Sequence, residues 1–423
     1  MKMKLRHFDS MQTRPVGIVT LTMLVFSVAI SSAAQTSIFR VQTSPSPNVI
    51  GNTINAVAAL SVNDAWAVGY QNDNNLNDSR SLTMHWNGVA WKTIPSPNPG
   101  GTPACNNQAN VLNAVTAIAT NDVWAVGFSW NSCTGDLIPM AIHWNGTAWK
   151  VVPTPLTPAM KALAGNAAFN GIVSFASNNV VAVGYQPASN GAVLTLVERW
   201  DGTKWSIVTT PNGSPGGQSF SAVSATSPND IWAVGSLVIP NSNKAVQTFV
   251  EHFDGSTWSI VPSPSPIPNG VLNANVLQSV QAVSPIDVTA VGFVRGFGIR
   301  TLTLIERWDG VKWSVVSSPN PNQSVFSVLT GLAVVSPSNM YAVGYSANPT
   351  TGQHQTLIEH FNGRSWSIIA SPKKGVAQQL NGAFTVPNTR NIFVGGAFSN
   401  VGIDPEFGFL QIPKTLILFT PIG

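Results

Sequence analysis

Seven uncharged polar residues recur at one position of the chain and could together form a hydrogen-bonding ring. Amides and hydroxyls donate and accept hydrogen bonds without charge, so such a ring could bind a neutral polar ligand such as a sugar. The alternative is that these side chains satisfy backbone groups and ordered water, and their regular repetition favours this structural role. Each lies fourteen residues before a recurring glycine: Asn55, Asn113, Asn170, Ser221, Gln278, Thr330 and Asn381.

Acidic residues that do not repeat are the candidates for catalysis. A glycoside hydrolase needs two carboxyl groups that face each other across the substrate, and sequence alone does not show which pairs meet. The acids in the predicted variable loops are Asp73, Asp78, Asp136, Asp404 and Glu406.

A second group of acids repeats in register, just before a predicted hairpin. Catalytic carboxylates seldom repeat in this way, so we interpret this group as charges on the edges of the sheets. Its members are Glu198, Glu251, Glu306 and Glu359.

The element that positions these residues is a repeat of about fifty residues. Its most regular feature is Ala-Val-Gly, whose glycine returns at spacings from 58 residues (Gly69 to Gly127) down to 51 (Gly344 to Gly395). Self-similarity at this period is typical of propellers and solenoids. The recurring glycines are Gly69, Gly127, Gly184, Gly235, Gly292, Gly344 and, in a degenerate copy, Gly395.

One copy of the repeat predicts four antiparallel strands. In the second copy, an Asn-Asp turn separates residues 113–119 from 123–128, and residues 140–144 and 149–153 flank Asn145-Gly146. Asn-Gly between alternating apolar residues is a strong hairpin signal, because both residues tolerate positive φ. Tryptophans flank this hairpin in most copies, and we interpret them as packing between neighbouring sheets. Four such strands make one blade of a β-propeller.

The seventh copy lacks its fourth strand, and the N-terminus has one to spare. Residues 37–47 match residues 258–266, which form the fourth strand of another copy and its Ser-Pro tail. The sequence therefore predicts an all-β, seven-bladed β-propeller over residues 35–423, with four antiparallel strands per blade and the last blade completed by the N-terminal strand. Closure of this kind removes exposed strand edges.

The Ala-Val-Gly strand with its Trp-Asp/Asn-Gly-x-x-Trp hairpin resembles the repeats of secreted bacterial β-propeller proteins related to kelch and Asp-box propellers. The resemblance covers residues 37–420 and concerns architecture. Kelch repeats carry a double glycine after the second strand, which only the copy with Gly395-Gly396 has here, and Asp-box hairpins separate an Asp and a Gly that are adjacent at Asp201-Gly202. The resemblance therefore implies a fold but no family enzymology.

Residues 1–34 have the features of a secretory signal peptide. Lys2 and other basic residues precede an apolar run over residues 16–30, and Ser32-Ala33-Ala34 is a small-residue cleavage site. Cleavage would leave 17 basic and 16 acidic residues. We therefore expect a secreted or cell-surface monomer that has neither a nucleic-acid partner nor a stable membrane insertion.

The two cysteines, Cys105 and Cys133, are expected to form a disulfide in an exported protein. Neither has a metal-ligand spacing, so we expect no metal and no other cofactor.

Taken together, these features favour a binding or scaffold protein over an enzyme. Its partner would be a carbohydrate or an extracellular protein, held on the face that carries the variable loops. The alternative is a carbohydrate-active hydrolase or lyase that uses the same face.

Overall fold

The computed structural model describes residues 37–72, 78–100, 108–162, 166–240, 245–267, 273–296, 300–321, 326–348, 350–403, 410 and 412–421. The predicted signal peptide, residues 1–34, lies outside this range and stays a prediction. The described residues form strands and one short helix, α1 (Pro158–Ala162). Within this range no helix has the length and apolar character needed to cross a membrane.

The strands follow one another in sets of four antiparallel strands, in the pattern that the repeat predicts. The first strands are β2 (Asn52–Ser61), β6 (Gln108–Ala119), β10 (Ala168–Ala176), β14 (Gln218–Ser227), β18 (Ala274–Ser284), β22 (Ser327–Ser336) and β26 (Ala377–Thr385). The second strands are β3 (Asp64–Asn72), β7 (Asp122–Asn131), β11 (Asn179–Pro187), β15 (Asp230–Val238), β19 (Asp287–Arg295), β23 (Asn339–Ala347) and β27 (Ile392–Ser399).

The outer half of each set carries the hairpin. The third strands are β4 (Ser79–Trp86), β8 (Leu137–Trp144), β12 (Val193–Trp200), β16 (Val246–Phe253), β20 (Leu302–Trp308), β24 (His354–Phe361) and β28 (Lys414–Phe419). The fourth strands are β5 (Trp91–Ile94), β9 (Trp149–Val151), β13 (Trp205–Ile207), β17 (Trp258–Ile260), β21 (Trp313–Val316), β25 (Trp366–Ile368) and β1 (Arg40–Gln42). Each set is named below by its strands, so the first is the β2–β5 set.

The N-terminal strand belongs to the last set. β1 pairs antiparallel with β28, with Arg40 opposite Phe419 and Gln42 opposite Ile417. The resulting sheet has the order β1-β28-β27-β26. The N-terminal segment therefore supplies the fourth strand that the last repeat lacks, as its sequence indicates.

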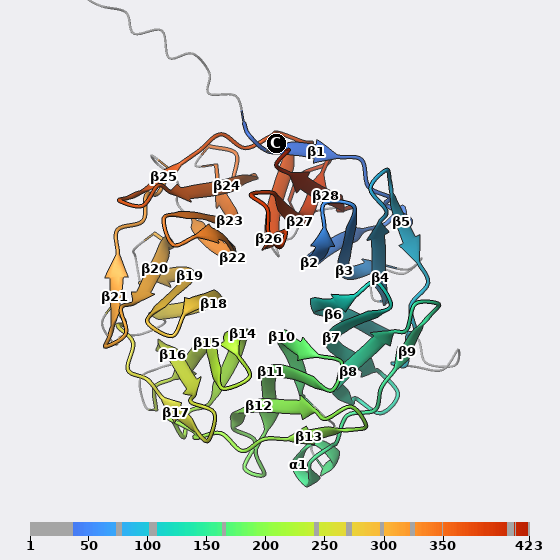
Figure 1. The fold of residues 1–423 in the computed structure, drawn as a ribbon, viewed down its shortest axis with the longest axis vertical. Coiled ribbons are helices and arrows are strands. Elements are labelled where there is room, and N and C mark those ends of the chain that lie inside the picture. Colours follow the sequence, from blue (N-terminus) through green and yellow to red (C-terminus); the bar gives the residue numbers. More distant parts are fainter. Residues whose placement is uncertain are drawn as a thin grey trace, which may run out of the picture. The chain divides into compact units, whose positions relative to one another are not determined.

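Successive sets pack face to face through their second strands, because those strands are apolar on both faces. Ala65 and Ala67 of β3 pack with Phe393 of β27, whereas Trp66 of β3 packs with Val123 of β7. The first strands contact one another in order, and β26 contacts β2. Within residues 37–421, the first strands lie nearest the middle and the fourth strands lie outermost (Figure 1).

The hairpins between third and fourth strands have the expected turn chemistry. The Asn87 side-chain oxygen accepts hydrogen bonds from the amides of Val89 and Ala90, and Asp201 does the same for Thr203 and Lys204. The following glycines adopt left-handed backbone angles, with φ of 88° at Gly88, for example. Asn and Asp are thus interchangeable at this position because only the acceptor oxygen is used.

The seventh repeat departs from the sequence prediction by one residue. Gly396, and not Gly395, is the equivalent of Gly69, because it lies against a carbonyl of the first strand. A Cβ added at Gly396 would lie 2.1 Å from the Gln379 oxygen, and one added at Gly69 would lie 2.0 Å from the Thr53 oxygen. Gly396 pairs with Leu380, whereas Gly395, the glycine that the sequence repeat indicates, pairs with Gly382. The reason is the longer connection between β26 and β27, residues 386–391, where the first set has only residues 62–63.

Candidate functional site

The seven candidate ring residues share one backbone position, a β-bulge in the first strand. In β2 the register shifts between Ile54 and Ala56, so that Asn55 is the extra residue, and the same shift occurs around each of the others. A bulge leaves one residue unpaired and re-aims its side chain. All seven residues are half-buried. They are called the collar below.

Most collar side chains link one set to the next. The amide nitrogen of Asn55 donates to the carbonyl of Leu112, which directly precedes Asn113 in the next first strand, at 2.9 Å. Asn113 and Asn170 each donate in the same way, to the carbonyls of Phe169 and Phe220.

The same links connect the end of the chain to its beginning. The hydroxyl of Thr330 donates to the carbonyl of Leu380 at 2.7 Å, and the amide of Asn381 donates to the carbonyl of Ile54 at 2.8 Å. These donor atoms hold neighbouring first strands together at their bulges. The collar thus has a structural task in five of its seven members, and whether it also binds a ligand stays a prediction.

The repeated glutamates are buried, so their interpretation as charges on sheet edges is wrong. Each has no exposed surface: Glu198, Glu251, Glu306 and Glu359. In β20, Glu306 alternates with Ile305 and lies on the same face as Leu304, which packs with Val250 of the preceding set. Each carboxyl therefore lies in the interface with the preceding set, because side chains two apart on a strand share a face.

These carboxyls have few polar partners. Both oxygens of Glu198 and of Glu251 lack a hydrogen-bond partner in the described part of the chain. Glu359 is the exception, because the hydroxyl of Ser318 in the preceding set donates to it at 2.9 Å. Desolvation by burial raises the pKa of each of the four carboxyls to about 8, and the Ser263 hydroxyl opposes the rise at Glu306. Near neutral pH they are therefore mainly uncharged carboxylic acids.

Histidine–aspartate pairs also recur, and they resemble the base and orienting group of a catalytic dyad. His85 bonds Asp64 at 2.8 Å, and its ring lies 4.6 Å from that of Trp66. The pair repeats at His143 and His252, and in the β18–β21 set Arg307 and Asp287 take its place. Since arginine replaces histidine without loss of the pairing, these contacts fasten the third strand to the second. Among the described residues no group of His, Cys, Asp and Glu could hold a metal ion.

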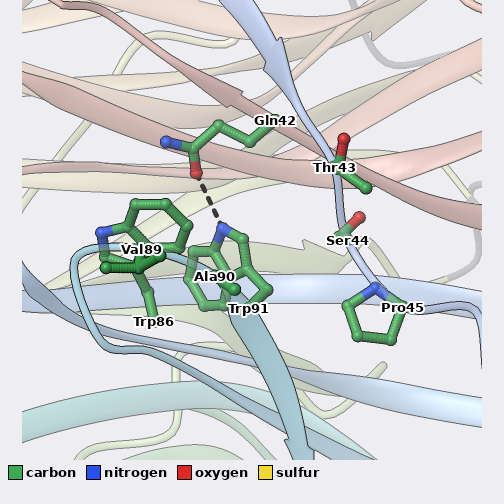
Figure 2. Close-up of a pocket in the computed structure, with 8 residues that line it drawn as sticks. All are labelled: Gln42, Thr43, Ser44, Pro45, Trp86, Val89, Ala90 and Trp91. Atoms are coloured by element: carbon green, nitrogen blue, oxygen red, sulfur yellow. Dashed lines mark hydrogen bonds between the residues drawn. The ribbon is translucent and has the colours of Figure 1, made fainter.

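A cavity of about 440 Å³ opens between the last set and the first, where β1 passes the β4–β5 hairpin (Figure 2). Its walls are the indoles of Trp86 and Trp91 on one side and Gln42, Thr43 and Ser44 on the other. None of the described residues that line it carries a charge. We call this cavity the β1 groove.

Hydrogen bonds fix both indoles of the β1 groove. The Trp91 ring nitrogen donates to the Gln42 side-chain oxygen at 2.7 Å, which Figure 2 shows as a dashed line. The Trp86 ring nitrogen donates to the carbonyl of Val62 at 2.9 Å. Trp91 is buried, Trp86 is partly buried, and the two ring centroids lie 5.8 Å apart.

Sequence reasoning missed the β1 groove, although a signal for it exists. When Phe39 is aligned with Trp258, the Ser-Pro-Ser-Pro tails coincide and Gln42 stands where the other copy has Val261. Every other copy has valine or isoleucine at this position: Ile94, Val152, Val208, Val261, Val316 and Ile369. One polar residue in an otherwise apolar register is the feature that marks the groove.

The remaining site predictions fall partly outside the described residues. Cys105 lies outside them, so the disulfide with Cys133 stays a prediction. Asp73, Asp404 and Glu406 also lie outside them. Of the acids inside the range, Asp78 accepts a hydrogen bond from the backbone amide of Gln108 at 2.7 Å.

Comparison with known proteins gives the fold and no family. No protein-family model and no curated protein sequence matches the chain. A solved structure of YCF48 bound to D1 peptide is similar, with 14% identity, a TM-score of 0.51 and coverage of 92% of this chain and 98% of the other. An ulvan lyase of polysaccharide lyase family PL25, bound to a GlcA–Rha3S saccharide, has 9% identity, a TM-score of 0.54 and coverage of 89% and 95%. The chain is thus an all-β protein of the propeller type.

Proposed function

We propose that this chain is an exported binding protein on a closed, seven-bladed propeller, and that its partner is a carbohydrate or an extracellular protein. The observation that carries this proposal is the β1 groove, a cavity of about 440 Å³ lined by aromatic, amide and hydroxyl groups without a charged residue. Ligand pockets of this size are mostly apolar with a few placed polar groups, whereas hydrolysis of a glycoside needs titratable acids.

The blade count rests on the repeat and on the links between sets. The four-stranded pattern recurs from β2–β5 through to β26–β28 with β1, and Asn381 donates to the carbonyl of Ile54. A rigid closed scaffold suits binding, because pre-formed sites lose little entropy on association.

The two similar structures support the range of partners and no more. One is bound to a peptide and the other to a saccharide. The end of the sets that carries the longer connections remains a second candidate surface in this proposal, since loops on a rigid scaffold often carry binding.

A combined binding and hydrolysis screen tests the proposal. The chain without residues 1–34 is applied to a glycan array and incubated with the same glycans in solution, and we expect binding without turnover. Release of cleaved products, or of unsaturated products, would replace the proposal by the hydrolase or lyase alternative.

The collar is tested in the same screen by replacing Asn113, Asn170 and Asn381 together with Ala. Loss of binding in a folded variant would give the collar a ligand role. Because each amide holds a neighbouring carbonyl, we expect instead a lower melting temperature and a loss in the free energy of unfolding of about 1 kcal/mol for each lost hydrogen bond.

A further inference from the structure

We propose that the β1 groove binds a single neutral pyranose residue, which stacks on Trp86 and receives hydrogen bonds from Gln42 and Thr43. This inference rests on the proposed binding function and names its ligand class and its site. A pyranose ring has an apolar face of C–H groups and an edge of hydroxyls, and the groove has one surface suited to each.

The aromatic side of the groove is held ready for stacking. The hydrogen bond to the carbonyl of Val62 fixes the partly buried indole of Trp86, and its ring packs against that of Trp91. Val89, at the hairpin tip, is 84% exposed and extends the apolar surface beside it. A side chain that is already fixed loses little conformational entropy when a ligand binds.

The polar side of the groove keeps hydrogen-bonding capacity for a ligand. Gln42 uses its side-chain oxygen on Trp91, and its amide nitrogen makes no hydrogen bond to any described residue. The exposed hydroxyl of Thr43 likewise has no partner among the described residues, whereas Ser44 is committed to Thr415 at 2.8 Å. A donor and a hydroxyl beside an aromatic ring match the edge and the face of a sugar.

The absence of charge from the lining selects a neutral ligand. A sugar acid would have to leave its carboxylate partly desolvated without a cationic partner, which is costly. A neutral sugar has no such charge, and its hydroxyls can pair with the amide and hydroxyl groups.

The corresponding groove between the β18–β21 and β22–β25 sets is smaller, and an arginine covers its aromatic ring. Phe361 and Trp366 take the places of Trp86 and Trp91, but the guanidinium of Arg307 lies 5.6 Å from the centre of the Phe361 ring. In the last set Phe419 occupies the position of Arg307, because Gly396 pairs with Leu416 as Gly292 pairs with Leu304. The cavity there measures about 290 Å³, and Val316 stands where the β1 groove has Gln42. Neither a free aromatic face nor an amide is present in this second groove.

The experiment measures sugar binding by the change in intrinsic tryptophan fluorescence. The wild-type chain, the binding variants Gln42→Val and Trp86→Phe, and the control Trp200→Ala are each titrated with glucose, galactose, mannose, N-acetylglucosamine and glucuronate. Valine is the residue of other copies at position 42, and Phe253 and Phe361 show that phenylalanine fits at position 86. Trp149, Trp205 and Trp313 already have buried ring nitrogens without a described partner, so Gln42→Val should fold.

We expect saturable binding of at least one neutral sugar and a loss of about tenfold or more in Gln42→Val, because a buried hydrogen bond to a ligand is lost. Trp86→Phe should weaken binding less, and Trp200→Ala, at the same position of another set, should leave it unchanged. Equal affinity in wild type and Gln42→Val would overturn the inference and leave the binding function standing. Binding of glucuronate alone, or of no sugar at all, would also overturn it, and the array screen then decides the wider function.

Discussion

Two regions of the molecule solve the same packing problem with different chemistry. At one position of the third strand, the first two sets and the last carry apolar side chains: Met84, Ile142 and Leu418. The four sets between them carry the buried glutamates. All seven side chains are fully buried between neighbouring sets. The fold therefore accepts a carboxyl where it also accepts a methyl or thioether group.

What differs is how each region responds to pH. An apolar interface does not titrate. A buried glutamate has a pKa of about 8 in the folded state, whereas its ordinary value is 4.5. Because the two values differ, the free energy of unfolding depends on pH. Below about pH 4.5 both states hold the proton. As the pH rises toward 8, only the unfolded chain ionises, so stability falls, and above 8 the buried groups themselves begin to ionise.

The largest effect follows from the four carboxyls acting together. We expect the free energy of unfolding to fall as the pH rises from 5 to 8, because each buried carboxyl keeps its proton in the folded state while the same group ionises in the unfolded chain. Thermal unfolding over this range measures it. The variant with all four glutamates replaced by Gln has no such protons to lose and should show a flatter profile. A wild-type melting temperature that rises toward pH 8 would contradict the burial of neutral carboxyls.

A carboxyl placed in the apolar region should reproduce this behaviour there. Ile142→Glu puts an acid between the β2–β5 and β6–β9 sets, into a cluster of apolar side chains. We expect a loss of about 2–5 kcal/mol at pH 8 and a smaller loss at pH 5, where the acid can stay neutral. Ile142→Met is the control for packing alone. Equal losses at the two pH values would mean that the new carboxyl reaches water.

The opposite exchange should stabilise the middle region at high pH. Glu251→Met introduces the residue of the first set, and the oxygens of Glu251 have no partner in the described structure. Replacing such a group by an apolar one of similar size removes its desolvation cost, so we expect a gain of about 1–4 kcal/mol at pH 8. Chemical unfolding at pH 8 and pH 5 measures it. Glu251→Gln, which keeps a buried polar group, should gain less.

The strands and hairpins of this fold could be predicted because their signals are local. Asn145-Gly146 needs only its own backbone to make a turn, and the N-terminal strand was found by its match to residues 258–266. The burial of the glutamates was not predicted, because the usual charge of a glutamate was given more weight than the alternation of buried and exposed residues along the strand. Period-two alternation already placed Glu198 on the face of Leu196, which is a core face.

The β1 groove and the role of the collar depend on contacts distant in sequence. Gln42 meets Trp91 only because β1 joins the last set and lies beside the β4–β5 hairpin of the first, and Asn381 meets Ile54 across 327 residues. Repetition predicted that the collar residues share a position, but a shared position does not show what the side chain contacts. The bulge that frees each of them is a backbone feature without a residue signature of its own here.

The smallest effect concerns Glu359, whose carboxyl accepts a hydrogen bond from Ser318. Ser318→Ala removes the hydroxyl that donates to Glu359, and a buried carboxyl left without it should cost about 1–2 kcal/mol. Ser371 is the matched control, because it occupies the same position of its own set and bonds Thr356, while the following set presents Leu418. Denaturant unfolding of Ser318→Ala and Ser371→Ala at pH 6 compares a hydroxyl that faces a carboxyl with one that faces an alkyl group. Equal losses would mean that Ser318 acts through Thr303 in its own set, and the difference between the two regions would then lie in the carboxyls alone.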